Sequence, residues 1–93
     1  MAMNERELEK QLKALANRRR LLILKHLKTH REATVSEIAG AIHLSFKATS
    51  KHLGILSGLD IVERDQRSLQ VFYSLAPIDS SGSYAIRHIL SIL

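Results

Sequence analysis

Residues 45–56 read SFKATSKHLGIL, and this stretch decides the fold. Ser45 is a good N-cap, because its hydroxyl oxygen can accept a hydrogen bond from a backbone amide in the first turn of a helix. Thr49, Leu53 and Leu56 then recur at i, i+4 and i+7, which predicts one buried side. The outward side chains are Phe46, Lys47, Ser50, Lys51, Gly54 and Ser57. Such small, hydrogen-bonding and cationic side chains suit a DNA major groove, although an ordinary solvated helix face has the same character.

A shorter helix is expected directly before this stretch. Thr34 and Glu37 stand three residues apart ahead of an apolar run, which is the spacing of a capping box. The apolar positions that follow at helical spacing are Val35, Ile38, Ala39 and Ile42. They give this helix one buried side. The two helices, joined by a tight turn, are typical of a helix-turn-helix.

Two amphipathic helices are expected ahead of this pair. Residues 5–16 repeat leucine at i, i+4 and i+7, and residues 18–28 carry a broad apolar side. Asn17 can cap the second of these helices. The polar residues 29–33 are interpreted as a loop that leads into the helix-turn-helix.

The chain after the helix-turn-helix predicts a hairpin and a last helix. Residues 61–65 and 69–75 are rich in β-forming side chains and predict two strands, with a tip at residues 66–68. Residues 84–93 repeat apolar side chains at helical spacing.

A helix-turn-helix followed at once by a two-stranded hairpin is a winged helix. We therefore predict a mainly α (α+β) fold with the recognition helix at residues 45–58 and the wing at residues 61–75. In winged helices the second helix of the motif enters the major groove, and the hairpin reaches the backbone or the minor groove. Ninety-three residues are near the low end of what buries an adequate core, so we expect one domain over residues 1–93.

The distribution of charge favours a polyanionic partner. The formal net charge is +5, and residues 17–31 hold six Lys and Arg side chains and no acid. A basic block inside a folded domain attracts polyanions in a salt-dependent way. The sequence contains no apolar run long enough to span a membrane. It also has no cysteine, which excludes disulfides and thiolate metal sites and fits a cytoplasmic location.

A set of short motifs carries a family resemblance over residues 12–76. They are Leu15-Ala16-Asn17, Arg20-Leu21, Ile23-Leu24, Ile38-Ala39, Leu44-Ser45, Ser50, His52-Leu53, Ile55-Leu56, Ile61-Val62 and Val71-Phe72-Tyr73-Ser74-Leu75. With them, the chain resembles the ArsR-type family of small winged-helix repressors. The resemblance implies a homodimer, held by its first and last helices, that binds a palindromic operator. Many members of that family release DNA when a metal or another signal binds.

Three positions depart from the family's pattern, in which glycine is frequent. His43 stands in the turn of the helix-turn-helix, Asp60 stands after the recognition helix, and Ser68 stands at the wing tip. His and Asp adopt positive φ more readily than most residues, so the first two turns remain compatible with the fold. Ser68 leaves the type of the wing turn open.

A metal site is not expected. The cysteine pair of several ArsR-type sensors is replaced by Val35-Ser36-Glu37. On the last helix Asp79 and His88 are candidates, but Ser81 stands where such a site would require His.

His26 and His30 have a spacing that can bring two imidazoles to one Zn²⁺, yet cations crowd them and no third ligand is evident. His43 and His52 are interpreted as a turn residue and as a helix-packing residue or phosphate contact. The sequence therefore predicts no metal and no other cofactor. It also lacks the phosphate loop, the zinc-protease motif and the nucleophile elbow of common enzymes, so no catalytic residue is assigned.

The predicted DNA contacts fall on three elements. Groove and phosphate contacts are assigned to Ser45, Phe46, Lys47, Ser50 and Lys51, wing contacts to Arg64 and Arg67, and further phosphate contacts to Arg18 or Arg19. A winged helix can instead be a protein-interaction module without DNA binding, since fold does not fix function. Phe46 supports that alternative, although an aromatic ring can also contact a thymine methyl.

The helices at the two ends of the chain carry more apolar side chains than so small a domain leaves exposed. They are Leu8, Leu12, Ile86, Ile89, Leu90 and Leu93. We expect these helices to pack together in a two-fold dimer, which would match a palindromic site.

Overall fold

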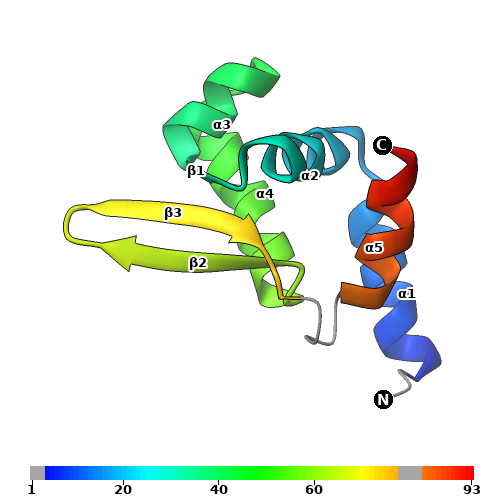
Figure 1. Cartoon of the computed structure of the whole chain (residues 1–93). Helices are drawn as coiled ribbons and strands as arrows, with labels where there is room; N and C mark the ends of the chain where they lie inside the picture. Colours follow the sequence, from blue (N-terminus) through cyan, green and yellow to red (C-terminus); the bar gives the residue numbers. More distant parts are fainter. Residues whose placement is uncertain (1–3, 78–82) are drawn as a thin grey trace.

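The computed structural model describes residues 4–77 and 83–93, and from residue 83 to residue 86 it describes the backbone only. The elements are α1 (Glu5–Leu15), α2 (Arg18–His30), β1 (Glu32–Thr34), α3 (Val35–Ile42), α4 (Phe46–Gly58), β2 (Val62–Arg67), β3 (Gln70–Leu75) and α5 (Ser83–Ile92). Figure 1 shows the β2–β3 hairpin at one end of the molecule and α1 and α5 at the other. The helix-turn-helix is α3–α4, the hairpin is its wing, and the predicted winged-helix fold is confirmed. Within the described ranges no helix is long and apolar enough to cross a membrane.

Side-chain caps start the helices where the sequence predicts them. The side chain of Asn17 caps α2. At α3 the Thr34 hydroxyl accepts from the Glu37 amide at 3.2 Å, and the Glu37 carboxylate accepts from the Thr34 amide at 2.8 Å. At α4 the Ser45 hydroxyl accepts from the Ala48 amide at 3.1 Å. Each cap satisfies an amide that has no partner inside its helix, so the start of α4 is fixed locally.

The three residues that stand in place of glycine all have a left-handed backbone. The φ angles are 56° at His43, 58° at Asp60 and 56° at Ser68. The expectation that His43 and Asp60 fit their turns is therefore confirmed. Arg67 pairs with Gln70 as the last pair of the hairpin, which leaves a two-residue loop with positive φ at its first residue. That pattern is typical of a type II′ turn, whose twist matches the flanking strands.

The recognition helix is fixed by its buried side. Thr49, Leu53 and Leu56 are fully buried, as predicted, and the two leucines join a core that includes Ile23 and Leu24 of α2. Burial of a leucine side chain contributes about 1.5–3 kcal/mol. The Thr49 hydroxyl donates to the Ser45 carbonyl at 2.8 Å, so the polar member of this side has a partner. These contacts fix which side chains of α4 face outward.

The sheet differs from the sequence prediction in two respects. Residues 32–34 form β1, which pairs with β3 and completes an antiparallel sheet of order β1-β3-β2. The prediction of a polar loop over residues 29–33 is wrong there, because a three-residue strand is too short to show an alternating pattern. In the same region α2 extends to His30. The predicted hairpin tip is also wrong, because β2 continues through Arg67 and the loop is Ser68-Leu69.

Candidate nucleic-acid interface

The outward side of α4 presents two free cations. Lys47 and Lys51 are exposed, and in the described part of the chain neither has a carboxylate within 4.0 Å. They stand four residues apart, so they lie on one face of the helix. Phe46 is 60% exposed at the start of α4, and Ser50 is half-buried beside it. The Ser45 hydroxyl accepts a hydrogen bond in its cap, which leaves its own proton available to another acceptor.

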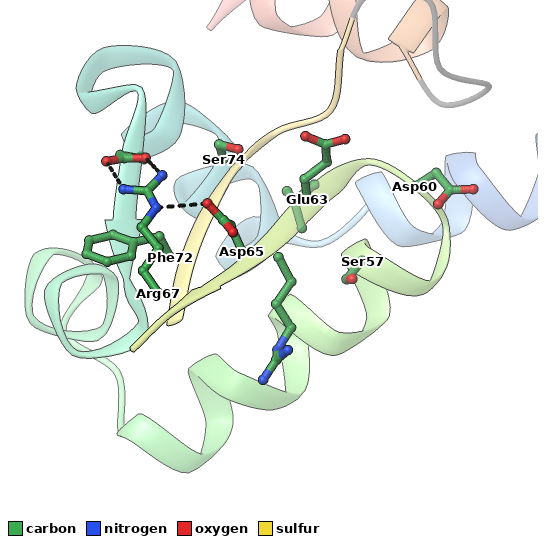
Figure 2. Close-up of a pocket in the computed structure, with 10 residues that line it drawn as sticks. Ser57, Asp60, Glu63, Asp65, Arg67, Phe72 and Ser74 are labelled. Atoms are coloured by element: carbon green, nitrogen blue, oxygen red, sulfur yellow. Dashed lines mark hydrogen bonds and ion pairs between the residues drawn. The ribbon is translucent and has the colours of Figure 1, made fainter. Parts of the chain in front are cut away.

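In the wing, unlike on α4, a basic side chain is paired: Arg67 contacts two carboxylates. Its Nη1 and Nη2 donate to the two carboxylate oxygens of Glu32 at 2.9 and 2.6 Å, and its Nε donates to Asp65 Oδ2 at 2.8 Å. The Cζ atom of Arg67 lies 4.5 Å from the ring centroid of Phe72. Figure 2 shows this group, with the Arg67 side chain pointing along the sheet toward its partners.

The pairing changes the acidity of both partners. Hydrogen bonding to Glu32, and then to Asp65, raises the pKa of Arg67 above its ordinary value. The hydrogen bond from Arg67 lowers the pKa of Glu32. A bidentate arginine–carboxylate pair is well oriented. Arg67 must therefore exchange these carboxylates for a phosphate if it is to make the predicted wing contact.

The surroundings of Arg67 are unfavourable for a polyanion. A cleft of about 640 Å³ beside the wing is lined by Glu32, Asp60, Glu63 and Asp65, together with Arg64, Arg67 and four uncharged residues. Figure 2 shows the acids spread along this side of the sheet. Arg64 is exposed and, among the residues described, has no carboxylate within 4.0 Å. Arg64 is thus the free cation of the wing, and the loop itself presents Leu69, which is 98% exposed.

A second cleft lies between the start of α2 and the helix-turn-helix. It has a volume of about 550 Å³ and is lined by Asn17, Arg18, Arg19, Leu22, Ile42, His43 and His52. The structure thus brings the predicted phosphate contacts Arg18 and Arg19 together with two imidazoles. Arg20, the next residue, turns inward instead: its Nε donates to Nδ1 of His52 at 3.2 Å. That contact was not predicted, because the two residues lie on different helices and no spacing pattern relates them.

The predicted dimer residues divide into two groups. Leu8 and Leu12 are 41% and 50% exposed and line a mainly apolar groove on α1. Ile89 and Leu90 are partly buried against the core of their own chain. Leu93, directly after α5, is half-buried, and Ile92, the last residue of α5, is 83% exposed and was not among the predicted residues. Ile86 lies on α5, but its side chain lies outside the described residues.

The histidine pair on α2 is compact, and the described residues bring no third metal ligand to it. The rings of His26 and His30 stack with centroids 4.1 Å apart. Burial, and then the neighbouring His30, lower the pKa of His26. In residues 4–77 and 83–93 no group of three or more metal-ligating side chains comes together. His88 is exposed, whereas Asp79 and Ser81 lie outside the described residues. The expectation of no metal site stays a prediction.

The second helix of the helix-turn-helix presents unpaired cations, and a hairpin wing follows it. These features are those of the winged-helix transcriptional regulators, which bind DNA through a domain of this fold. Residues 17–64 match the model of the family described as bacterial regulatory protein, arsR family. The chain belongs to the ArsR family of bacterial regulatory proteins.

Individual relatives agree with that assignment. The transcriptional activator HlyU of Vibrio cholerae is 35% identical over 93 residues, which cover 92% of this chain and 85% of HlyU. A solved structure of HlyU from that organism has a TM-score of 0.79 at 32% identity and covers 99% of this chain and 97% of its own. The transcriptional repressor BigR from Xylella fastidiosa has a TM-score of 0.78 at 26% identity, covering 95% of this chain and 84% of BigR.

A third solved structure that resembles this chain is a homodimer. It is the homodimeric winged helix-turn-helix DNA-binding domain of a possible ArsR-family transcriptional regulator from Mycobacterium bovis. Its TM-score is 0.79 at 26% identity, and the match covers 99% of this chain and 88% of that one.

Proposed function

We propose that this chain acts as a homodimer on a palindromic operator, with α4 in the major groove of each half-site and the β2–β3 wing against the flanking backbone. The free cationic face of α4 carries the proposal, because Lys47 and Lys51 project from a helix whose opposite side is buried. Lysine can pair with guanine O6 and N7 in the major groove. Ser45, Phe46 and Ser50 border this face and complete the set of groove contacts that we propose.

The exposed end helices support a two-fold dimer. Leu8 and Leu12 on α1 and Ile92 on α5 expose apolar surface at the end of the molecule opposite the wing (Figure 1). A dimer joined there would hold two recognition helices apart, as a palindrome requires. The homodimeric relative from Mycobacterium bovis is consistent with this arrangement.

We propose repression as the direct consequence of operator binding, because a bound dimer occludes the promoter sequence that it covers. The named relatives include the activator HlyU and the repressor BigR, so the family admits both signs. A promoter–reporter fusion with and without the chain would measure the sign. As a DNA-binding regulator the chain would act in the cytoplasm, where bacterial DNA lies.

The test is selection of bound sequences from a random duplex library, followed by fluorescence anisotropy on the selected operator. We expect a palindromic consensus, binding of mixed-sequence duplex at low salt, and affinity that falls steeply with salt. Lys25→Ala is the control for substitutions of the α4 lysines, because it removes an exposed cation from α2 outside the cleft that Arg18 and Arg19 line. Absence of binding to any duplex at low salt, with the fold intact by circular dichroism, would refute the proposal.

One observation favours the alternative of a protein-interaction module. Phe46 and the fully exposed Leu69 line a common groove of about 320 Å³ between the helix-turn-helix and the wing loop. If duplex binding fails, Phe46→Ala should then abolish capture of the protein partner.

A further inference from the structure

The cationic cleft between α2 and the helix-turn-helix has the chemistry of an anion site. Arg18 and Arg19 come from the first turn of α2, His43 from the turn before α4, and His52 from α4 itself. No carboxylate lines the cleft in the described part of the molecule. Guanidinium groups match the geometry of phosphate oxygens and bind them through several N–H donors.

The hydrogen bond from Arg20 decides the tautomer of His52. An arginine side chain only donates, so Nδ1 of His52, 3.2 Å from Arg20 Nε, must act as the acceptor. A neutral imidazole with an accepting Nδ1 carries its proton on Nε2. Arg20 is itself oriented, because its Nη1 donates to the Ala14 carbonyl at 3.2 Å.

The same contact leaves the Nε2–H of His52 for another acceptor. His52 lines the cleft, whereas Arg20 lines a different groove, between α1 and the later part of α4. Burial, followed by the charges of Arg20, Arg19 and Lys51, lowers the pKa of His52. The ring is therefore neutral near pH 7 and offers one directed N–H donor. Among the described residues, His43 is the other titratable side chain that lines the cleft besides Arg18, Arg19 and His52.

We propose that this cleft binds a phosphate group, and that its occupant is one phosphodiester of the DNA backbone beside the recognition helix. Arg18 and Arg19 supply the charge, His52 Nε2–H supplies an oriented hydrogen bond, and Arg20 is a positioning residue that fixes the tautomer. The proposal rests on the proposed function, because the phosphodiester belongs to the operator. Contacts of this kind set the register of a protein on the duplex without reading bases.

Substitutions at His52 separate its two ring nitrogens. The side-chain amide of glutamine places its NH₂ near the position of Nε2, and that of asparagine places it near Nδ1. We expect His52→Gln to keep operator affinity within about 2-fold, and His52→Asn and His52→Ala to weaken it about 5- to 10-fold. His30→Ala is the matched control, because it removes an exposed imidazole at the far end of α2, outside the cleft. Equal affinities of all three His52 variants and the unsubstituted chain, with unchanged thermal unfolding, would overturn the proposal.

The positioning role of Arg20 has a spectroscopic readout. Nitrogen-15 NMR of the His52 ring should show the Nε2–H tautomer in the unsubstituted chain and a mixture of tautomers in Arg20→Met. Arg20→Met should weaken operator binding, yet add little in a His52→Gln background, which has no tautomer to fix. Arg20→Lys keeps a donor and serves as the folded comparison. An unchanged tautomer in Arg20→Met, or full additivity of the two substitutions, would exclude the positioning role.

Neutral backbone linkages identify the occupant. Replacing single operator phosphates by methylphosphonates should reveal one position per half-site where the replacement weakens binding of the unsubstituted chain more than binding of His52→Ala, which has already lost one of the contacts to that phosphate. Inorganic phosphate, titrated into the DNA-free protein, should bind weakly and shift the NMR signals of the His52 ring. In a separate titration it should compete with DNA for the protein. Tight binding of inorganic phosphate that leaves DNA affinity unchanged would overturn the assignment to the backbone, as would the lack of any such position. Failure of the proposed function itself would look different, because the unsubstituted chain would then bind no duplex.

Discussion

The recognition helix and the wing both carry two basic side chains, but among the described residues the helix leaves both of them unpaired and the wing leaves only Arg64 unpaired. On α4, Lys47 and Lys51 face solvent without a carboxylate within 4.0 Å among the described residues. In the wing, Arg67 is paired with Glu32 at 2.6 Å and Asp65 at 2.8 Å. The comparison shows that the number of basic residues in a segment does not measure the charge that it can offer to a phosphate.

The pairing of Arg67 also has a structural consequence. Glu32 lies on β1, directly before the helix-turn-helix, and Arg67 lies at the far end of β2. Their bidentate contact thus joins the end of the wing to the strand that leads into α3. Both side chains keep about half of their surface exposed, so salt screens the contact and phosphate oxygens can compete for it. Arg67 is therefore better suited to orienting the wing than to supplying free charge.

The largest effect on operator binding should come from splitting the proposed dimer, which separates its two recognition helices and its two wings. Leu12→Glu places a charge in the apolar groove on α1, where we expect the dimer to form. Loss of the second recognition helix should weaken operator binding by about 100-fold or more, because bivalent binding gains by that order. Light scattering at tens of micromolar should then report a monomer with unchanged circular dichroism. A monomeric mass for the unsubstituted chain would contradict the dimer.

Within one protomer the recognition helix should dominate specificity. Lys47→Ala should cost about 1–3 kcal/mol on the selected operator and much less on random duplex, because a base contact is lost. Anisotropy on both duplexes gives the specificity ratio, with Lys25→Ala as the charge-matched control. An equal loss on the two duplexes would show that Lys47 contacts phosphate only.

The wing should contribute smaller and less selective effects. Arg64→Ala should weaken operator and random duplex by similar, few-fold factors and make the salt slope shallower by about one ion per chain. Arg67→Ala should change the slope less, because its charge is already paired. Glu32→Gln removes one carboxylate from Arg67 and should strengthen binding to random duplex. If Arg67→Ala instead changed the slope as much as Arg64→Ala, phosphate would displace Glu32 in the complex.

The smallest effect should be on the pH dependence of the free energy of unfolding. The recognition helix α4 contributes to it through His52, whereas the wing carries no histidine. The pKa of folded His52 lies below its ordinary value of 6.5, so the unfolded chain binds more protons as the pH falls through 6.5. The free energy of unfolding should therefore decrease as the pH is lowered through 6.5. Urea unfolding at about pH 7.5 and about pH 5.5 measures this, and His52→Gln should flatten the dependence. His26, whose pKa is also lowered, should account for part of the remainder. A steeper dependence in His52→Gln would refute the assignment.

The sequence by itself determined the elements whose signals are local. The caps at Asn17, Thr34 and Ser45 and the buried side of α4 were predicted correctly, because each depends on residues three or four positions apart. The left-handed turns at His43 and Asp60 also follow from side chains that tolerate positive φ.

Only the tertiary structure decided which charges are free. Arg67 and Glu32 lie 35 positions apart, and Arg20 and His52 lie 32 apart, so no periodicity relates either pair. β1 likewise exists because β3 supplies hydrogen-bond partners for a segment too short to be recognised alone. A contact between distant residues depends on the packing of whole elements, and an arginine paired with an acid has the same sequence signal as one that faces solvent.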